Sequence, residues 1–183
     1  MNRYLILLIF ITSSIFGETI HRGKVVEANN SMVVTRHFLA TEIGNNVLQN
    51  GGNAIDASIA ISFALAVVLP QAGNIGGGGF MVIHNQDSNF TIDYREQAPL
   101  LATEKMFITD GLYDPELALE SYQSSGTPGA VAGMYLAHQE FGSIKWKDLI
   151  QPSIDLARNG FIVTKTLEHL SLIHISEPTR RRT

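Results

Sequence analysis

The feature that most constrains this chain is a helix-length stretch, Ala54 to about Leu69, that is apolar on nearly every side. Asn53 is a good N-cap residue for it, and Asp56 is well placed at the positive end of the helix dipole. A helix of a soluble protein without a polar face is buried on all sides. The stretch is too short and too rich in serine and alanine for a membrane span. The sequence therefore predicts a layered fold in which protein covers this helix on both faces.

Composition restricts the chemistry that the chain can carry. It has 183 residues, which suits one domain or part of one, and 45% of them are hydrophobic, as in an ordinary globular core. The net charge of −4 gives no reason to expect a nucleic-acid partner. No cysteine is present, which excludes disulfides, thiolate zinc sites and a cysteine nucleophile, and the six histidines show no metal-ligand spacing.

Apolar spacing and turn residues predict the remaining elements. We expect strands at Met32–Val34, Phe80–His84 and Asn89–Tyr94, a loop-like segment at Leu100–Glu120, and helices at Ala40–Gln49, Pro128–Phe141 and, in two parts that Pro152 separates, Trp146–Asn159. Thr41 and Thr127 are the expected caps of the first two of these helices. Asn50-Gly51-Gly52, Gly142 and Gly160 are expected to end the three helical segments in turn. The polar turn between the second and third strands predicts an antiparallel hairpin.

The N-terminus has the pattern of a secretory signal at residues 1–17. Arg3 gives a short positive segment, Tyr4–Phe16 an apolar one, and Gly17 a small residue before the cleavage position. An uncleaved anchor and a buried helix are the alternatives, and the apolar run is too short to span a bilayer comfortably. We therefore expect a mature chain that is periplasmic or secreted and has no stable membrane span.

The C-terminal segment differs in its residue pattern from the sequence before it. The run Leu170–Arg180 resembles a translated sequencing adaptor, so residues 170–183 are expected to be a non-native tail. A genuine basic C-terminus is the alternative. On the first interpretation residues 18–169 are the native part. On either interpretation we expect a truncated chain, because the sequence stops soon after a helix and has no closing strand.

Four consecutive glycines, Gly76–Gly79, stand between the apolar helix and the hairpin. Each costs more backbone entropy on folding than any other residue, so such a run is expected where backbone passes close to another group or where φ is positive. A phosphate loop would need a lysine and a hydroxyl residue where Phe80 follows, and a dinucleotide fingerprint would need a strand before it and a helix after it. Two interpretations remain: close packing of a helix on a sheet, or the wall of a substrate pocket.

Arg95 follows the second strand of the hairpin. A guanidinium fork binds a carboxylate through two hydrogen bonds, which an ammonium group cannot match. The alternative is a structural salt bridge to Asp93 or Glu96. The residues alone favour neither interpretation.

Other polar residues give weaker signals. Thr35 beside His37 suggests a hydroxyl nucleophile next to a base, but no orienting acid or oxyanion donor is evident. His84 is expected to be a turn residue, and His138 is expected to face solvent from its helix.

Five motifs, in order and at similar spacing, closely resemble those of the γ-glutamyltransferase family. They are Gly51–Ala57, Gly73–Phe80, Tyr94–Pro99, Gly126–Gly133 and Asp148–Pro152, within a match that covers roughly Met32 to Glu168. The resemblance implies an α/β (α+β) fold of the N-terminal-nucleophile hydrolase type, a four-layer α-β-β-α sandwich. This chain would hold a part of that sandwich, incomplete without the small subunit, and its apolar helix would belong to one helical layer.

The resemblance also implies the chemistry. Family members are made as one precursor that cuts itself into a large and a small subunit, and the new N-terminal threonine of the small subunit attacks γ-glutamyl amides such as glutathione. The glutamyl group then passes to water or to an amino acid, and no metal or organic cofactor is needed.

For this chain the resemblance implies a binding role and no catalytic residue. Arg95 matches the arginine that binds the α-carboxylate of the glutamyl group, and the glycine run would be a buried structural stretch behind it. We therefore expect a chain that is inactive without the small subunit of the same precursor. The alternatives are a secreted, non-catalytic module that binds a carboxylate ligand through Arg95, and a structural fragment with no function of its own.

Overall fold

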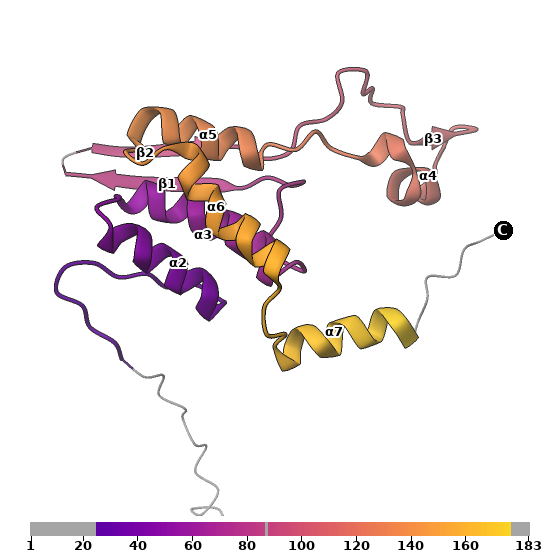
Figure 1. The fold of residues 1–183 in the computed structure, drawn as a ribbon. Helices are drawn as coiled ribbons and strands as arrows, with labels where there is room; N and C mark the ends of the chain where they lie inside the picture. Colours follow the sequence, from indigo (N-terminus) through magenta and orange to yellow (C-terminus); the bar gives the residue numbers. More distant parts are fainter. Residues whose placement is uncertain (1–24, 87, 177–183) are drawn as a thin grey trace, which may run out of the picture. The chain divides into compact units, whose positions relative to one another are not determined.

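The structure of the protein is a computed structural model that describes residues 25–86 and 88–176 (Figure 1). The chain divides into two compact units after Ser31. The described part of the first unit, residues 25–31, is exposed and contains neither helix nor strand. The signal predicted at residues 1–17 lies outside the described residues. All elements below belong to the second unit.

Helix α2 spans Phe38–Gln49 and begins two residues earlier than predicted. Its cap is His37, whose Nδ1 accepts a hydrogen bond of 3.3 Å from the Leu39 N–H, so the prediction that Thr41 is the cap is wrong. Thr41 lies inside the first turn, where its hydroxyl is 2.8 Å from that of Thr35. The helix ends at Asn50 as predicted, and Gly51 follows with a φ of 90°.

The strand predicted at Met32–Val34 is not formed. The segment is irregular, and Val34 is 84% exposed. A strand needs a neighbour to satisfy its backbone N–H and C=O groups. None of the strands in the described part of the chain pairs with this segment.

Helix α3, Ala54–Val68, is the predicted apolar helix. It starts with a capping box: the Asn53 side chain accepts from the Ile55 and Asp56 N–H groups, and the Asp56 carboxylate accepts from the Asn53 N–H. One flank of the helix is buried; its most deeply buried apolar residues are Ile59, Ala60, Ala64 and Val68. The other flank is half-buried, at Ile61, Phe63, Leu65 and Val67. Cover on both faces is therefore only partial within the described residues.

The predicted hairpin is confirmed. Strands β1, Phe80–Asn85, and β2, Ser88–Asp93, pair antiparallel, with Phe80 opposite Asp93 and Asn85 opposite Ser88. Alternate residues face opposite sides of the pair. Ile83 is buried, whereas Phe80 and Val82 on the other face are 60% and 78% exposed. The hairpin thus has one core face and one open face.

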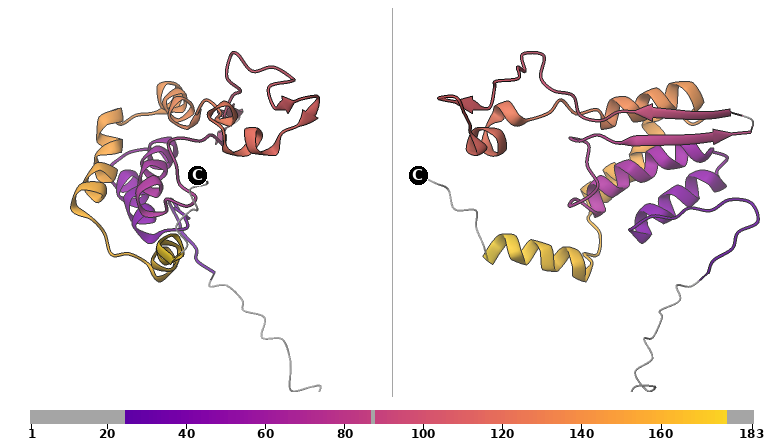
Figure 2. Two further views of the ribbon diagram at one scale, coloured as in Figure 1. Left: turned by 90° about the vertical axis from the view of Figure 1, so that its right-hand side faces the viewer. Right: turned by 180° about the vertical axis from the view of Figure 1, so that it is seen from behind.

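Helix α5, Ala130–Phe141, lies along the hairpin (Figure 2). It begins two residues later than predicted, and Gly129, not Thr127, occupies the cap position. Thr127 is not the cap because its backbone pairs with Gln97 in an antiparallel bridge, with N···O distances of 2.8 and 3.1 Å. The helix ends at Gly142 as predicted.

Helix α6, Trp146–Asn159, is continuous, so the prediction that Pro152 divides it is wrong. A proline inside a helix removes one hydrogen bond and crowds the preceding turn. Packing compensates here, because α6 lies against α3 and buries Leu149 and Ser153 on that side. Gly160 ends the helix with a φ of 79°, as the sequence predicts.

The core joins three helices and one strand. Its buried residues come from α3, β1, α5 and α6: Ile55, Ile59, Ala60, Ile83, Met134, Ala137 and Leu149. Trp146, Phe63 and Phe141 are partly buried and pack around this cluster. Around this core, α2 packs on α3, α3 packs on α5 and α6, and α5 packs on β2.

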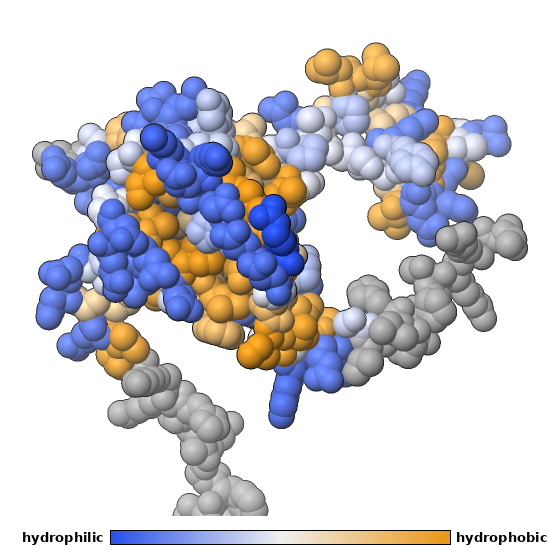
Figure 3. Space-filling view, viewed as in Figure 1, coloured by the Kyte–Doolittle hydropathy of each residue, from blue (hydrophilic) through white to orange (hydrophobic). Residues whose placement is uncertain are grey.

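The segment predicted as loop-like contains small elements that the sequence did not indicate. They are β3 at Ile108–Thr109, β4 at Leu112–Tyr113 and α4 at Pro115–Glu120, and a 3₁₀ turn at Tyr122–Ser124 follows the segment. We call residues 98–126 the excursion, because the Gln97–Thr127 bridge closes it at its base. None of its residues is buried, and Figure 3 shows apolar side chains on its surface.

Helix α7, Lys165–Ser176, is the last described element. It includes the first residues of the segment predicted to be a non-native tail, which are therefore helical here. Residues 177–183 of that segment lie outside the described residues.

Candidate functional site

Arg95 lies just beyond the end of the β1–β2 pair. Tyr94 and Gly79 exchange backbone hydrogen bonds of 3.0 and 3.3 Å, which extend the hairpin by one residue on each side. The Arg95 N–H donates to the Asp93 carboxylate at 3.0 Å. The backbone that carries Arg95 is thus fixed by the hairpin and by the side chain of its own strand.

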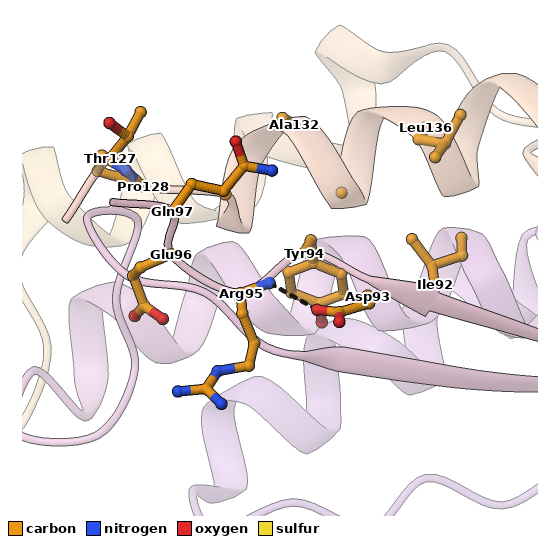
Figure 4. Close-up of a pocket in the computed structure, with 12 residues that line it drawn as sticks. Ile92, Asp93, Tyr94, Arg95, Glu96, Gln97, Thr127, Pro128, Ala132 and Leu136 are labelled. Atoms are coloured by element: carbon orange, nitrogen blue, oxygen red, sulfur yellow. Dashed lines mark hydrogen bonds between the residues drawn. The ribbon is translucent and has the colours of Figure 1, made fainter. Parts of the chain in front are cut away.

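The Arg95 side chain extends away from this anchored backbone. Its guanidinium carbon lies 6.0 Å from the centre of the Phe80 ring, on the open face of the hairpin. Figure 4 shows the guanidinium pointing away from Ala132 and Leu136 of α5. Arg95 is exposed, and its planar group therefore has its donors accessible to an incoming anion.

The structural salt bridge that the sequence left open is not formed within the described residues. Asp93 accepts from the main-chain N–H of Arg95, and the Arg95 guanidinium makes no ion pair with Asp93 or Glu96. The Asp93 carboxylate therefore orients the backbone rather than neutralising the side chain. This arrangement favours the carboxylate-binding interpretation of Arg95.

A cavity of about 510 Å³ lies on the other side of the Arg95 backbone. Its lining comes from the end of β2, from α5 and from the Gln97–Thr127 bridge, and includes Ile92, Gln97, Thr127, Ala132 and Leu136 (Figure 4). Arg95 is among the residues that line the cavity, and its guanidinium points away from the α5 side of the lining.

The glycine run packs closely against this segment. A Cβ atom on Gly78 would lie 2.6 Å from the Tyr94 carbonyl oxygen, a distance that no real side chain tolerates. The Gly77 carbonyl accepts hydrogen bonds of 2.9 Å from the N–H groups of Gly129 and Ala130, at the start of α5. Close packing behind Arg95 is confirmed. The run is not buried, however, because Gly76 is exposed and the other three glycines are half-buried.

The Thr35–His37 pair is structural. The Thr35 hydroxyl donates to the His37 carbonyl oxygen at 2.8 Å, and the His37 ring caps α2 through its Nδ1 atom. No hydrogen bond joins the hydroxyl to the imidazole among the described contacts, and such a bond is what activates a hydroxyl nucleophile. This pair is therefore removed from the candidate site.

His84 and His138 also have structural contacts. His84 Nδ1 lies 2.9 Å from the Asn89 side-chain oxygen on the neighbouring strand, at the exposed end of the hairpin. The prediction that His138 faces solvent is wrong, since it is half-buried and its Nε2 lies 2.7 Å from the Ile144 carbonyl oxygen. Its ring also packs 5.3 Å from Trp146. Helical spacing alone did not show that the chain folds back over this position.

Asp56 has a larger role than its sequence position indicated. Its carboxylate is fully buried and accepts hydrogen bonds from the backbone N–H groups of Asn53, Ser143 and Ile144 and from the Ser143 hydroxyl. Burial alone would raise the pKa of Asp56, but these hydrogen bonds outweigh it and hold the pKa below its ordinary value. Asp56 thereby joins the start of α3 to the connection between α5 and α6. No sequence signal pointed to its distant partners.

Comparison with known proteins gives one consistent result. The profile of the family described as Gamma-glutamyltranspeptidase matches residues 40–177. The glutathione hydrolase proenzyme of Escherichia coli (strain K12) is 48% identical over 144 residues, which are 78% of this chain and 25% of that protein. The corresponding proenzyme of Bacillus subtilis (strain 168) is 44% identical over 148 residues, which are 79% of this chain and 25% of that protein.

Solved structures agree with the sequence matches. The crystal structure of Helicobacter pylori gamma-glutamyltranspeptidase superposes with a TM-score of 0.76 at 45% identity, and the match covers 83% of this chain and 44% of that one. This likeness confirms the predicted fold class, a part of the N-terminal-nucleophile hydrolase fold. The chain spans about a quarter of the length of the curated relatives that it matches.

Proposed function

Because the chain belongs to the γ-glutamyltranspeptidase family, we propose that it supplies the part of a glutathione hydrolase that binds the glutamyl group of the substrate. Arg95 binds the α-carboxylate of that group through its guanidinium fork. The substrates are glutathione and related γ-glutamyl compounds, and the glutamyl group is transferred to water or to an amino acid.

The observation that carries this proposal is the state of the Arg95 guanidinium. The Arg95 N–H donates to Asp93, and the preceding residue, Tyr94, exchanges backbone hydrogen bonds with Gly79, so the backbone at Arg95 is fixed. The guanidinium itself has no acidic partner in the described part of the chain. Phe80 lies beside it at 6.0 Å and limits its approach on one side. A fixed backbone with an accessible fork suits a ligand with one planar anionic group.

The reaction needs groups beyond those described here. In the proposed enzyme, the nucleophilic threonine belongs to the small subunit of the same precursor, and its own amino group acts as the base. The residues of this chain orient the substrate so that its γ-amide faces that nucleophile. No metal or organic cofactor takes part in the proposed reaction.

The proposed location is the periplasm or the exterior of the cell. The signal pattern of residues 1–17 and the two bacterial proenzymes that the chain resembles support it. Among the described residues, no helix combines the length and the apolarity that a membrane crossing requires.

The test of this function is Arg95→Lys in the full-length protein that carries this segment. Lysine keeps the charge but loses the bidentate geometry, so we expect a raised KM for γ-glutamyl donors, equivalent to about 1.5–3 kcal/mol of lost binding. The effect should be confined to donors with a free α-carboxylate and should largely disappear for a donor whose α-carboxylate is an amide. Arg158→Lys, at the exposed end of α6, is the matched control. Equal KM values in Arg95→Lys and the wild type would remove Arg95 from the site.

A further inference from the structure

The Tyr94 ring lies between bare stretches of backbone that come from two distant parts of the sequence. A Cβ atom on Gly133 of α5 would lie 2.2 Å from Tyr94 Cγ, and one on Gly79 would lie 2.9 Å from Tyr94 Cε2. Both distances are shorter than real Cβ contacts. The ring therefore occupies a space that exists only because these two positions lack side chains.

The peptide between Tyr94 and Arg95 is enclosed in the same way. A Cβ atom on Gly78 would lie 2.7 Å from Arg95 Cα, and one on Gly129 would lie 2.2 Å from the Tyr94 carbonyl oxygen and 2.9 Å from that of Arg95. We call Gly78, Gly79, Gly129 and Gly133 the glycine socket. It holds the ring of Tyr94 and the backbone of Arg95 together.

The two halves of the socket are joined to each other independently of Tyr94. The Gly77 carbonyl accepts the hydrogen bonds of the Gly129 and Ala130 N–H groups, both at 2.9 Å. No side chain caps the start of α5, so this carbonyl takes the place of a capping residue. The glycine run and α5 thus form a frame into which Tyr94 fits.

We propose that Tyr94 is the positioning residue for Arg95: its ring, held in the glycine socket, fixes the direction in which the Arg95 side chain leaves the hairpin. This inference rests on the proposed function of Arg95. The Arg95 side chain is exposed, so its backbone is its main constraint. A displacement of the Arg95 Cα atom would move the whole guanidinium and weaken its two hydrogen bonds to the α-carboxylate of the substrate.

The ring, not the hydroxyl, carries this role. The Tyr94 hydroxyl makes one contact, to the Phe80 carbonyl oxygen at 3.4 Å, which is long for a hydrogen bond between oxygen atoms. Tyr94→Phe keeps the ring and loses only this contact. Tyr94→Leu leaves part of the socket empty, and Gly79→Ala pushes against the ring. Tyr94→Phe therefore tests the hydroxyl alone. Tyr94→Leu tests the filling of the socket by the ring, and Gly79→Ala tests the displacement of the ring.

The experiment measures KM and kcat of these variants in the full-length protein, with a γ-glutamyl anilide as the donor. Tyr94→Leu and Gly79→Ala are expected to raise KM about tenfold or more with kcat changed far less, because Arg95 binds a group remote from the reacting amide. Tyr94→Phe and Gly76→Ala are expected to keep the wild-type KM. Gly76→Ala is the matched control, since a Cβ atom there meets nothing within 4 Å.

A second measurement keeps the test decisive if a variant matures poorly. In the full-length protein, whether or not it has matured, hydrogen exchange reports on the Tyr94 and Gln97 N–H groups, which donate to Gly79 and Thr127. Gly79→Ala should speed their exchange and Gly76→Ala should not. Unchanged exchange rates in Gly79→Ala would contradict the proposed role of the glycine socket. The same conclusion would follow if Tyr94→Leu kept the wild-type KM while Arg95→Lys raised it. If Arg95→Lys itself leaves KM unchanged, the proposed function fails, and the exchange result still stands as a test of the socket.

Discussion

Replacing Asp56 with asparagine should destabilise the chain by about 3 kcal/mol. The Asp56 carboxylate is fully buried and accepts from three backbone N–H groups, of Asn53, Ser143 and Ile144, at 2.9 to 3.2 Å, and from the Ser143 hydroxyl. Asparagine keeps one acceptor oxygen and presents an NH₂ group at the other position. With about two buried donors left unsatisfied at about 1–3 kcal/mol each, the loss is about 2–6 kcal/mol, and partial relaxation places it near the lower half of that range.

The assay is urea unfolding of the 183-residue chain, followed by the fluorescence of Trp146, its single tryptophan. Trp146 packs 5.6 Å from Phe63 of α3 and 5.3 Å from Tyr135 of α5, so it reports on the core that Asp56 joins. With a slope of about 2 kcal/mol per molar urea, the midpoint should fall by about 1.5 M. Asp155→Asn is the control: Asp155 is exposed, and its one hydrogen bond comes from Gln151 in the same helix.

The pH dependence gives an independent check. The hydrogen bonds lower the pKa of Asp56 in the folded chain below its ordinary value of 3.8, although burial opposes them. The stabilisation is therefore fully present above that ordinary value and is lost as the pH falls through the folded pKa. The midpoints of wild type and Asp56→Asn should differ at pH 7 and converge toward pH 2. A difference at pH 7 no larger than that of Asp155→Asn would refute the reasoning.

Two further predictions concern the whole chain and α6. The purified 183-residue chain should release no glutamate from a γ-glutamyl anilide, because the proposed nucleophile belongs to the small subunit; measurable turnover would contradict the proposed division of roles. Pro152→Ala should raise the free energy of unfolding by up to about 3 kcal/mol, and with it the thermal midpoint, since it restores a hydrogen bond inside a continuous helix. An unchanged or lower midpoint would mean that the proline has a favourable contact that offsets its cost.

Elements whose signals are local could be predicted from the sequence. The hairpin followed from two apolar runs around a polar turn, and its strands end within one residue of the predicted positions. The capping residue Asn53 and the stops at Gly51 and Gly160 likewise depend on neighbouring residues only. Arg95 was selected by a motif and by residue type, and the structure added that its guanidinium is accessible.

Features that depend on distant residues were missed for a common physical reason. Thr127 has the residue type of a helix cap, but its backbone pairs with that of Gln97, thirty positions earlier, in an antiparallel bridge. His138 has the spacing of a solvent-facing residue, but the chain returns over it at Ile144. Pro152 has the local effect of a helix breaker, but burial of Leu149 against α3 holds the helix together. In each case a tertiary contact overrides a valid local preference.

The Gln97–Thr127 bridge has a consequence for how this region can change. Residues 98–126 leave and re-enter the body of the chain through one pair of hydrogen-bonded residues, and none of them is buried. Insertions or deletions within such a closed loop add little closure entropy, because each doubling of its length costs only about 0.6 kcal/mol. The position two residues after Arg95 thus marks a border. On one side lie Gly78 and Gly79, where an added methyl group would clash with Tyr94 or Arg95, and on the other lies a segment whose length can change at little cost in closure entropy.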